Sequence, residues 1–291
     1  MASSIRAHYI LLKEEQIQLH YLECEGKQSS EEAILLLHGW PTSSFLYRKM
    51  MQPLAKHHRV IALDLPGFGK SDKNPGDSFS FRYHGRILDE FVAQLGIKKV
   101  HLVVHDLGGP IGLWWAQQHR EQVASYVILN TVVIPPFSWG VKLFVLMTLV
   151  PLVRKWLSSP AGIRFSMRLG IHDHSILTPE VLEGYQSPFV RTSDDSAARK
   201  SLLKSAHSLH MNGFKDVAEG LANISAPTCL ICAEKDRILP RVKETTQHIH
   251  ALIPHASNYS IPDCGHFLQE EKPTVVATIM SDFYQQLSHP S

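Results

Sequence analysis

The stretch from His101 to Trp115, HLVVHDLGGPIGLWW, decides the fold of this chain. Its first half is a nearly continuous apolar run, which is typical of a strand buried on both faces. Gly108 and Gly109 then permit a tight turn, and Pro110 suits the first turn of a helix. The stretch therefore predicts a strand, a sharp turn and a helix, with Asp106 at the apex of the turn.

Similar apolar runs recur along the chain, and each ends in a turn signal. They read AILLLHGWP, RVIALDLPGFG, ASYVILNTVV and TCLICAEKD, and a predicted hairpin, HYILLKEEQIQLHYLEC, precedes them. Segments with helical periodicity lie between the runs, for example YHGRILDEFVAQLG, which stops at Gly96. Alternating strands and helices predict an α/β fold with a mostly parallel, twisted sheet.

The alternation breaks between residues 135 and 211, where helical stretches follow one another without a convincing strand. We interpret this segment as a helical cap inserted into the sheet domain. The expected division is therefore a first part of the core over residues 1–134, the cap over 135–211 and a second part of the core over 212–291.

Composition limits the partners of the protein. The chain has 291 residues, of which 44% are hydrophobic and 19% charged, so a large buried core is expected. The net charge is only +2, and the cations form no stripe of the kind that binds phosphate backbones, so no nucleic-acid partner is expected. A homodimer is compatible with these features.

The termini and apolar segments predict a cytoplasmic protein. MASSIRAHYILLKEEQ contains neither a signal peptide nor a transit sequence. The most membrane-like run, from Leu143 to Val153, includes Pro151 and is shorter than the ~20 residues that a membrane span needs. The four cysteines have no framework spacing, and Cys229 and Cys232 lie three apart in a predicted strand, where they point to opposite faces. No metal site is expected.

Chemically capable residues follow the predicted strands. Because ligands of open parallel sheets bind beyond the carboxyl ends of the strands, these residues are expected at one edge. They are His38, Trp40, Asp64, Asp106, Asn130, Asp236 and, in a loop after the last strand, His266.

The motifs HGWPTSS, DLPGFGKSD, VVHDLGG, AEKD and DCGH resemble, in this order, those of the α/β-hydrolase superfamily, and within it the epoxide hydrolase and haloalkane dehalogenase group. The resemblance extends over nearly the whole chain. It implies that Asp106 is the nucleophile, Asp236 the acid that orients the histidine, and His266 the base. It also implies an oxyanion hole made by the backbone N–H groups of Trp40 and Leu107, and no cofactor.

A carboxylate nucleophile implies a particular chemistry. It displaces a leaving group at a saturated carbon and forms an alkyl ester, whereas a serine attacks a carbonyl carbon. The helix that follows Asp106 favours the ionised carboxylate through its dipole. Water activated by His266 would then cleave the ester, while Asp236 stabilises the histidine cation.

The leaving group distinguishes two functions. Dehalogenases of this group normally have a tryptophan after the nucleophile as a halide donor, but this chain has Leu107, so Trp40 and Trp139 would have to replace it. Epoxide hydrolases usually protonate the ring oxygen with two cap tyrosines, but this cap has only Tyr185. His207 and His210 are the other candidate donors, and packing is the alternative role for Tyr185.

We therefore predict an epoxide hydrolase that converts small apolar epoxides to vicinal diols with water. The alternatives are a haloalkane dehalogenase and, third, a catalytically silent binder of small molecules. The expected substrate pocket consists of aromatic and histidine side chains from the core and the cap: His38, Trp40, Trp139, Phe189 and Phe267.

Overall fold

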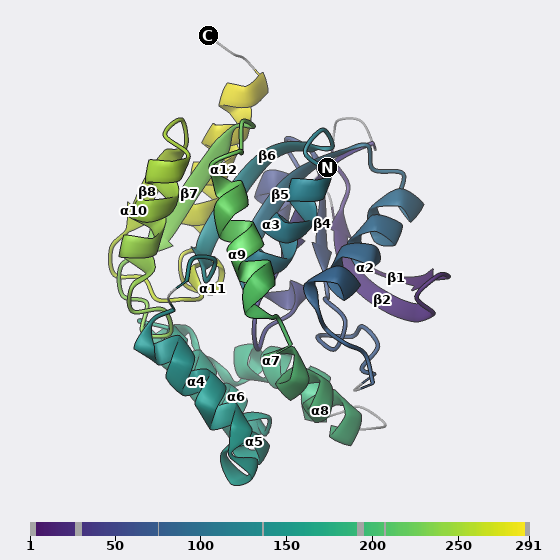
Figure 1. The fold of residues 1–291 in the computed structure, drawn as a ribbon, viewed down its shortest axis with the longest axis vertical. Helices are drawn as coiled ribbons and strands as arrows, with labels where there is room; N and C mark the ends of the chain where they lie inside the picture. Colours follow the sequence, from purple (N-terminus) through teal and green to yellow (C-terminus); the bar gives the residue numbers. More distant parts are fainter. Residues whose placement is uncertain are drawn as a thin grey trace.

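The computed structural model describes residues 4–26, 31–74, 76–135, 137–190, 195–206 and 208–288. Its centre is an eight-stranded sheet in the order β1-β2-β4-β3-β5-β6-β7-β8, in which only β2 runs against its neighbours (Figure 1). The strands are β1 Ile5–Leu12, β2 Ile17–Cys24, β3 Glu32–Leu37, β4 Arg59–Leu63, β5 Lys99–Asp106, β6 Val123–Thr131, β7 Thr228–Ala233 and β8 Ser257–Ile261. The α/β fold with a mostly parallel sheet is thereby confirmed.

Helices cover both faces of this sheet and one of its ends. They are α1 Met51–Leu54, α2 Phe81–Gln94, α3 Gly108–Gln118, α4 Trp139–Leu149, α5 Pro151–Leu157, α6 Pro160–Gly170, α7 Pro179–Val190, α8 Asp195–Ser205, α9 Met211–Leu221, α10 Val242–Leu252, α11 Leu268–Glu271 and α12 Pro273–Ser288. Single 3-10 turns span Ser44–Tyr47 and His174–Ile176.

The central strands are apolar because they are covered on both sides. Every residue of β5 except Lys99 is buried, and so is every residue of β7. Helices α2, α3 and α9 pack together, whereas α1 and α12 pack together and contact β4 and β7, respectively. This two-sided burial explains why the predicted strands read as continuous hydrophobic runs rather than alternating ones.

Local signals set the helix ends as predicted. Ser80 caps α2 by accepting a hydrogen bond from the backbone N–H of Tyr83, and Gly96 follows the helix at a φ of +66°.

In β7, Cys229 packs into the main core, whereas Cys232 packs against Leu239 and Val242. The two thiols are free, and their packing agrees with opposite faces of the strand.

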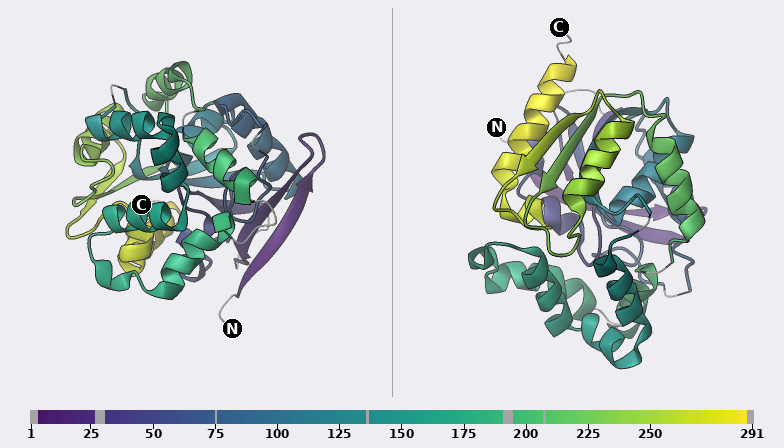
Figure 2. Two further views of the ribbon diagram at one scale, coloured as in Figure 1. Left: turned by 90° about the horizontal axis from the view of Figure 1, so that it is seen from below. Right: turned by 60° about the vertical axis from the view of Figure 1, so that its left-hand side comes forward.

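The helices α4 to α8 lie between β6 and β7 in the chain and form a separate layer below the sheet domain (Figures 1 and 2). The segment that we expected to form the cap, 135–211, contains these helices and ends at the first residue of α9, which packs against α3. Among the described residues, the longest apolar helices stop short of the length that would cross a bilayer.

Candidate active site

Asp106 occupies a sharp turn between β5 and α3. Its φ is +47°, in the left-handed region that side chains rarely adopt, and α3 begins two residues later at Gly108. A Cβ on Gly39 would lie 2.2 Å from Asp106 Oδ1, and one on Gly108 would lie 2.4 Å from the carbonyl oxygen of Leu37. Glycine is therefore required at Gly108 within the turn and at Gly39 in the loop that faces it. The turn holds the carboxylate at its apex.

Backbone donors hold the Asp106 carboxylate. The N–H of Trp40 donates to Asp106 Oδ1 over 2.8 Å, and the backbone of Leu107 also hydrogen-bonds the carboxylate. The hydroxyl of Thr131 donates to the Asp106 carbonyl oxygen over 2.8 Å and fixes the turn from the neighbouring strand. Two backbone N–H groups thus face the position where negative charge resides.

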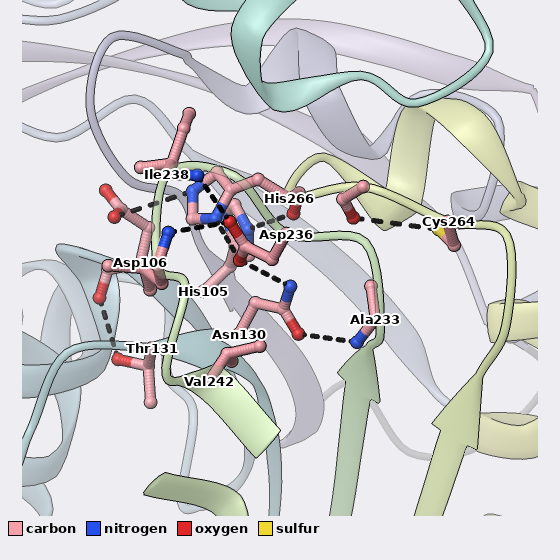
Figure 3. Close-up of polar contacts among 12 residues, drawn as sticks. His105, Asp106, Asn130, Thr131, Ala233, Asp236, Ile238, Val242, Cys264 and His266 are labelled. Atoms are coloured by element: carbon pink, nitrogen blue, oxygen red, sulfur yellow. Dashed lines mark hydrogen bonds and ion pairs between the residues drawn. The ribbon is translucent and has the colours of Figure 1, made fainter. Parts of the chain in front are cut away.

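His266 lies between two carboxylates (Figure 3). Its Nδ1–H donates to Asp236 Oδ2 over 2.8 Å, and its Nε2 lies 3.5 Å from Asp106 Oδ2. The imidazole is fully buried, and its Nε2 faces the Asp106 carboxylate. The structure therefore brings together the three residues that we expected to act as nucleophile, base and orienting acid.

Asp236 is fixed from several directions. Its Oδ2 also accepts from Asn130 Nδ2 over 2.8 Å, while its Oδ1 accepts from the N–H groups of Ile238 (2.8 Å) and Leu239 (2.7 Å). Asn130 is itself oriented, because its Oδ1 accepts from the N–H of Ala233 over 2.9 Å. The amide of Asn130 therefore supports Asp236.

The charges of the site depend on one another. Burial alone would raise the pKa of Asp106, but hydrogen bonding and charge from His266 lower it below its usual value. Burial would likewise lower the pKa of His266, but the charge of Asp236 and the contact with Asp106 raise it to about 10. The resting site is thus an imidazolium held between two carboxylates.

His105 is a neighbour of the site that sequence reasoning missed. Its ring lies 4.7 Å from that of His266, and its Nε2–H donates to the His266 carbonyl oxygen over 3.0 Å. Burial, followed by the charge of His266, lowers the pKa of His105 to about 3, so the ring is neutral. Its position directly before Asp106 in the motif VVHD could have indicated that His105 lies beside the site.

Three residues expected to line the pocket are fully or almost fully buried. His38 uses both ring nitrogens: Nδ1–H donates to the Gly39 carbonyl oxygen, and Nε2 accepts from the N–H of Leu65. Phe267 stacks edge-on against His266 at 4.9 Å, and Phe189 is 1% exposed. Both ring nitrogens of His38 are thus engaged within the protein, and Phe267 packs against the imidazole of His266.

The two tryptophan indoles proposed as halide donors are placed differently from our expectation. Trp40 Nε1–H donates to the carbonyl oxygen of Leu202 in α8 over 3.0 Å, and its ring packs against Phe144 of α4 at 4.7 Å. Trp139 is 71% exposed, so its expected position in the pocket is not the observed one. The reason is that it begins α4 on the outer side of the cap.

The candidate leaving-group donors from the cap have different surroundings. The hydroxyl of Tyr185 is buried and donates to Glu270 Oε2 over 2.6 Å, which agrees with its alternative, structural role. His210 is exposed at the N-terminus of α9. His207 lies outside the described residues. In this conformation the Tyr185 hydroxyl therefore donates its hydrogen bond to a core carboxylate.

Two adjacent glutamates, which we did not predict, tie the cap to the core. Glu270 accepts from Tyr185 and forms ion pairs with Arg48 and Lys49. Glu271 accepts from the N–H groups of Gly265 and of the cap segment 172–173. Because these glutamates follow His266 closely in the chain, the cap is anchored next to the catalytic loop.

A possible metal-ligand group lies at the opposite end of the strands, at the start of β3 and β5. Glu32, His58 and His101 each offer one ligand atom within 4.8 Å of the others. His101 already donates to Glu32 over 3.0 Å and accepts from the Ser125 hydroxyl over 2.7 Å. Hydrogen bonding accounts for the contacts of His101 with Glu32 and Ser125 without an ion.

The chain matches the family model for the alpha/beta hydrolase fold over residues 32–273. It is 29% identical to an uncharacterized hydrolase, YugF, of Bacillus subtilis (strain 168), over 87% of this chain and 89% of that protein. It is 26% identical to epoxide hydrolase 3 of Xenopus tropicalis (96% and 77% covered). It is also 28% identical to a haloalkane dehalogenase of Psychrobacter cryohalolentis (95% and 91% covered).

Solved structures show the same fold. Haloalkane dehalogenase DbeA from Bradyrhizobium elkani superposes with a TM-score of 0.85 at 22% identity, covering 99% of this chain and all of that one. Epoxide hydrolase CorEH superposes with a TM-score of 0.80 at 22% identity, covering 98% and 100%. The similarities thus include both types of enzyme and do not separate them.

Proposed function

The chain belongs to the alpha/beta hydrolase fold family, and from this premise we propose that it is a hydrolase that forms a covalent ester on Asp106. We propose an apolar epoxide as its substrate and a vicinal diol as its product. The observation that carries the proposal is a carboxylate, not a hydroxyl, at the apex of the turn, 3.5 Å from the Nε2 atom of His266.

The two oxygens of Asp106 have different surroundings, which suggests a role for each. Oδ1 accepts the Trp40 N–H, whereas Oδ2 faces His266. In the first step Oδ2 attacks a saturated ring carbon, a C–O bond forms, and the ring C–O bond breaks with its electron pair moving to the ring oxygen, which takes up a proton from solvent water. Oδ1 then becomes the carbonyl oxygen of the ester and keeps its backbone donors.

His266 serves the second step. Forming the ester removes the negative charge of Asp106, which is one of the causes that raise the pKa of His266. The imidazole therefore releases its proton more readily once the ester exists, and can take a proton from water. That water attacks the carbonyl carbon, and the N–H groups of Trp40 and Leu107 stabilise the resulting oxyanion at Oδ1. When the oxyanion collapses, the bond between Cγ of Asp106 and Oδ2 breaks, Oδ2 leaves with the diol and takes the proton from His266, and the Asp106 carboxyl group is restored.

The positions of the expected N–H donors weaken the haloalkane alternative. A halide leaving group needs N–H donors, but the indole of Trp40 already donates to Leu202, Trp139 is exposed, and Leu107 has an apolar side chain. The similarity to haloalkane dehalogenases keeps halide release as the second candidate. A silent binder is the third, and the polarised His266 between two carboxylates argues against it.

The proposal is tested with His266→Gln, because this change removes the base but leaves the nucleophile. The variant is incubated with an apolar epoxide such as styrene oxide and, in parallel, with a bromoalkane. Intact-mass and peptide mass spectrometry should show the added substrate mass on the Asp106 peptide. The double variant Asp106→Asn/His266→Gln is the matched control and should gain no mass.

Product assays of the wild-type enzyme separate the candidates. Diol formation without halide supports the epoxide proposal, and halide release from the bromoalkane assigns the second function instead. An unmodified Asp106 peptide in His266→Gln, at concentrations where the wild-type enzyme turns over, would overturn the covalent mechanism. A folded wild-type protein that forms neither product would return the binder to consideration and refute the enzyme assignment for these substrates.

A further inference from the structure

The outer surface of α4, α5 and α6 is unusually apolar. Among the described residues, nine of the thirteen exposed large hydrophobic side chains lie on these helices and the turns between them, whereas two of the other four lie on β1 and two elsewhere. We call this surface the outer cap face, defined by Trp139, Leu143, Leu146, Leu149, Val150, Leu152, Trp156, Phe165 and Leu169. Contiguous exposed apolar surface of this kind marks an interaction site.

Three neighbouring helices form the outer cap face. Helix α4 packs on α5, and α5 packs on α6. The rings of Trp156 and Phe165 lie 5.2 Å apart and link the last two helices. Figures 1 and 2 show the three helices at the end of the molecule farthest from the sheet. A partner can therefore approach this face without displacing the core.

The same face carries only positive charge. From residue 122 to residue 172 the chain has no aspartate or glutamate, although the whole sequence is nearly balanced with 29 basic and 27 acidic residues. The basic residues of the segment are all exposed: Lys142, Arg154, Lys155, Arg164 and Arg168. Arg164 and Arg168 also line a hollow with Phe165, so cations and apolar groups are interleaved.

We propose that the outer cap face docks on an anionic lipid bilayer. Its leucines and tryptophans would enter the boundary between head groups and acyl chains, and its five cations would contact lipid phosphates. A second copy of the chain fits less well, because a symmetric contact would place these cations opposite one another with no carboxylate on the face to pair with them. The docking is peripheral and needs no spanning helix.

The test is flotation of the full chain with vesicles of phosphatidylcholine alone and with vesicles containing 30% phosphatidylglycerol. The wild-type protein should float with the anionic vesicles and bind the neutral ones about tenfold less, and raised salt should weaken binding. Leu152→Glu changes the most exposed residue of the face, at 82%, and should reduce vesicle binding about tenfold or more.

Leu11→Glu is the matched control, because Leu11 is 52% exposed on β1 and the substitution adds the same charge. It should bind vesicles like the wild-type protein, and circular dichroism should show both variants folded. Wild-type protein that stays unbound with anionic vesicles would overturn the proposal, as would equal loss of binding in both variants. Self-association that Leu152→Glu abolishes, without vesicle binding, would assign the face to a second copy.

Discussion

The candidate active site and the outer cap face differ from the usual distribution of side chains in opposite ways. In the site, charged groups are buried: Asp106, Asp236 and His266 are at most 8% exposed. On the cap, large apolar groups such as Leu152 and Trp139 are exposed. Soluble proteins normally avoid both arrangements, so each is informative where it occurs.

The difference between the two regions lies in their partners. The buried carboxylate of Asp236 accepts four hydrogen bonds, from Asn130, Ile238, Leu239 and His266, within the protein. The outer cap face has no comparable cover among the described residues. The hydrogen bonds of Asp236 are therefore all made within one chain, whereas we infer that a partner outside the protein covers the outer cap face.

The largest expected effect comes from Asp106→Asn, because an amide has no nucleophilic oxygen anion. Turnover of the epoxide should fall about 10⁴-fold or more, while the protein stays folded. Steady-state diol assays with a melting curve as the folding control measure this. Residual turnover within tenfold of the wild type would show that the buried carboxylate is not the reacting group.

The second effect concerns pH and stability. Because the pKa of His266 is raised to about 10 from 6.5, its charged form stabilises the fold fully below about pH 6.5, and this contribution is lost as pH rises toward 10. Each unit of pKa difference corresponds to about 1.4 kcal/mol. Urea unfolding of wild type and His266→Gln at pH 6.5 and 9.5 should therefore show a smaller difference at the higher pH. Equal differences would mean that His266 is not charged at rest.

Tyr185→Phe probes the junction between the two regions. It removes a buried hydrogen bond to a charged carboxylate, so the free energy of unfolding should fall by about 1.5–3 kcal/mol. The rate of ring opening should change less than tenfold, because the hydroxyl already donates to Glu270. A loss of about 10²-fold in single-turnover ester formation, with stability unchanged, would restore Tyr185 as the proton donor.

Asn130→Ala removes one of the donors that fix Asp236. Turnover should fall about 10- to 100-fold, as for other residues that orient a catalytic partner. The loss should appear in ester hydrolysis, measured by accumulation of the Asp106 adduct, rather than in its formation. Asn130→Asp is a useful companion, because it keeps the shape but replaces the donor by a second carboxylate. Unaltered adduct levels in both variants would limit Asn130 to a structural role.

The smallest effect is expected from Leu152→Glu in the absence of lipid. An exposed side chain contributes little to folding, so the free energy of unfolding should stay within about 0.5 kcal/mol of the wild type. Diol formation from a water-soluble epoxide should also be unchanged. A large loss in either measurement would show that this part of the cap is packed in the protein rather than exposed, and would remove the contrast with the site.

Local sequence patterns predicted the sheet and the candidate site residues at the carboxyl ends of its strands. Continuous apolar runs followed by turn residues are local properties, and they placed Asp106, Asp236 and His266 after buried strands. The parallel arrangement then brings such positions to one edge of the sheet. The glycines beside Asp106 were readable for the same reason, since a tight turn requires them.

The partners of each side chain depend on the packing of distant elements. Tyr185 meets Glu270 across 85 positions, Asn130 meets Asp236 across 106, and the indole of Trp40 meets Leu202 across 162. The sequence offered Tyr185 and Trp40 as donors, but it could not show that their protons are already engaged. It also gave no sign that Trp139 would face outward. Periodicity describes which residues are apolar, whereas the direction of a side chain depends on how distant elements pack against it.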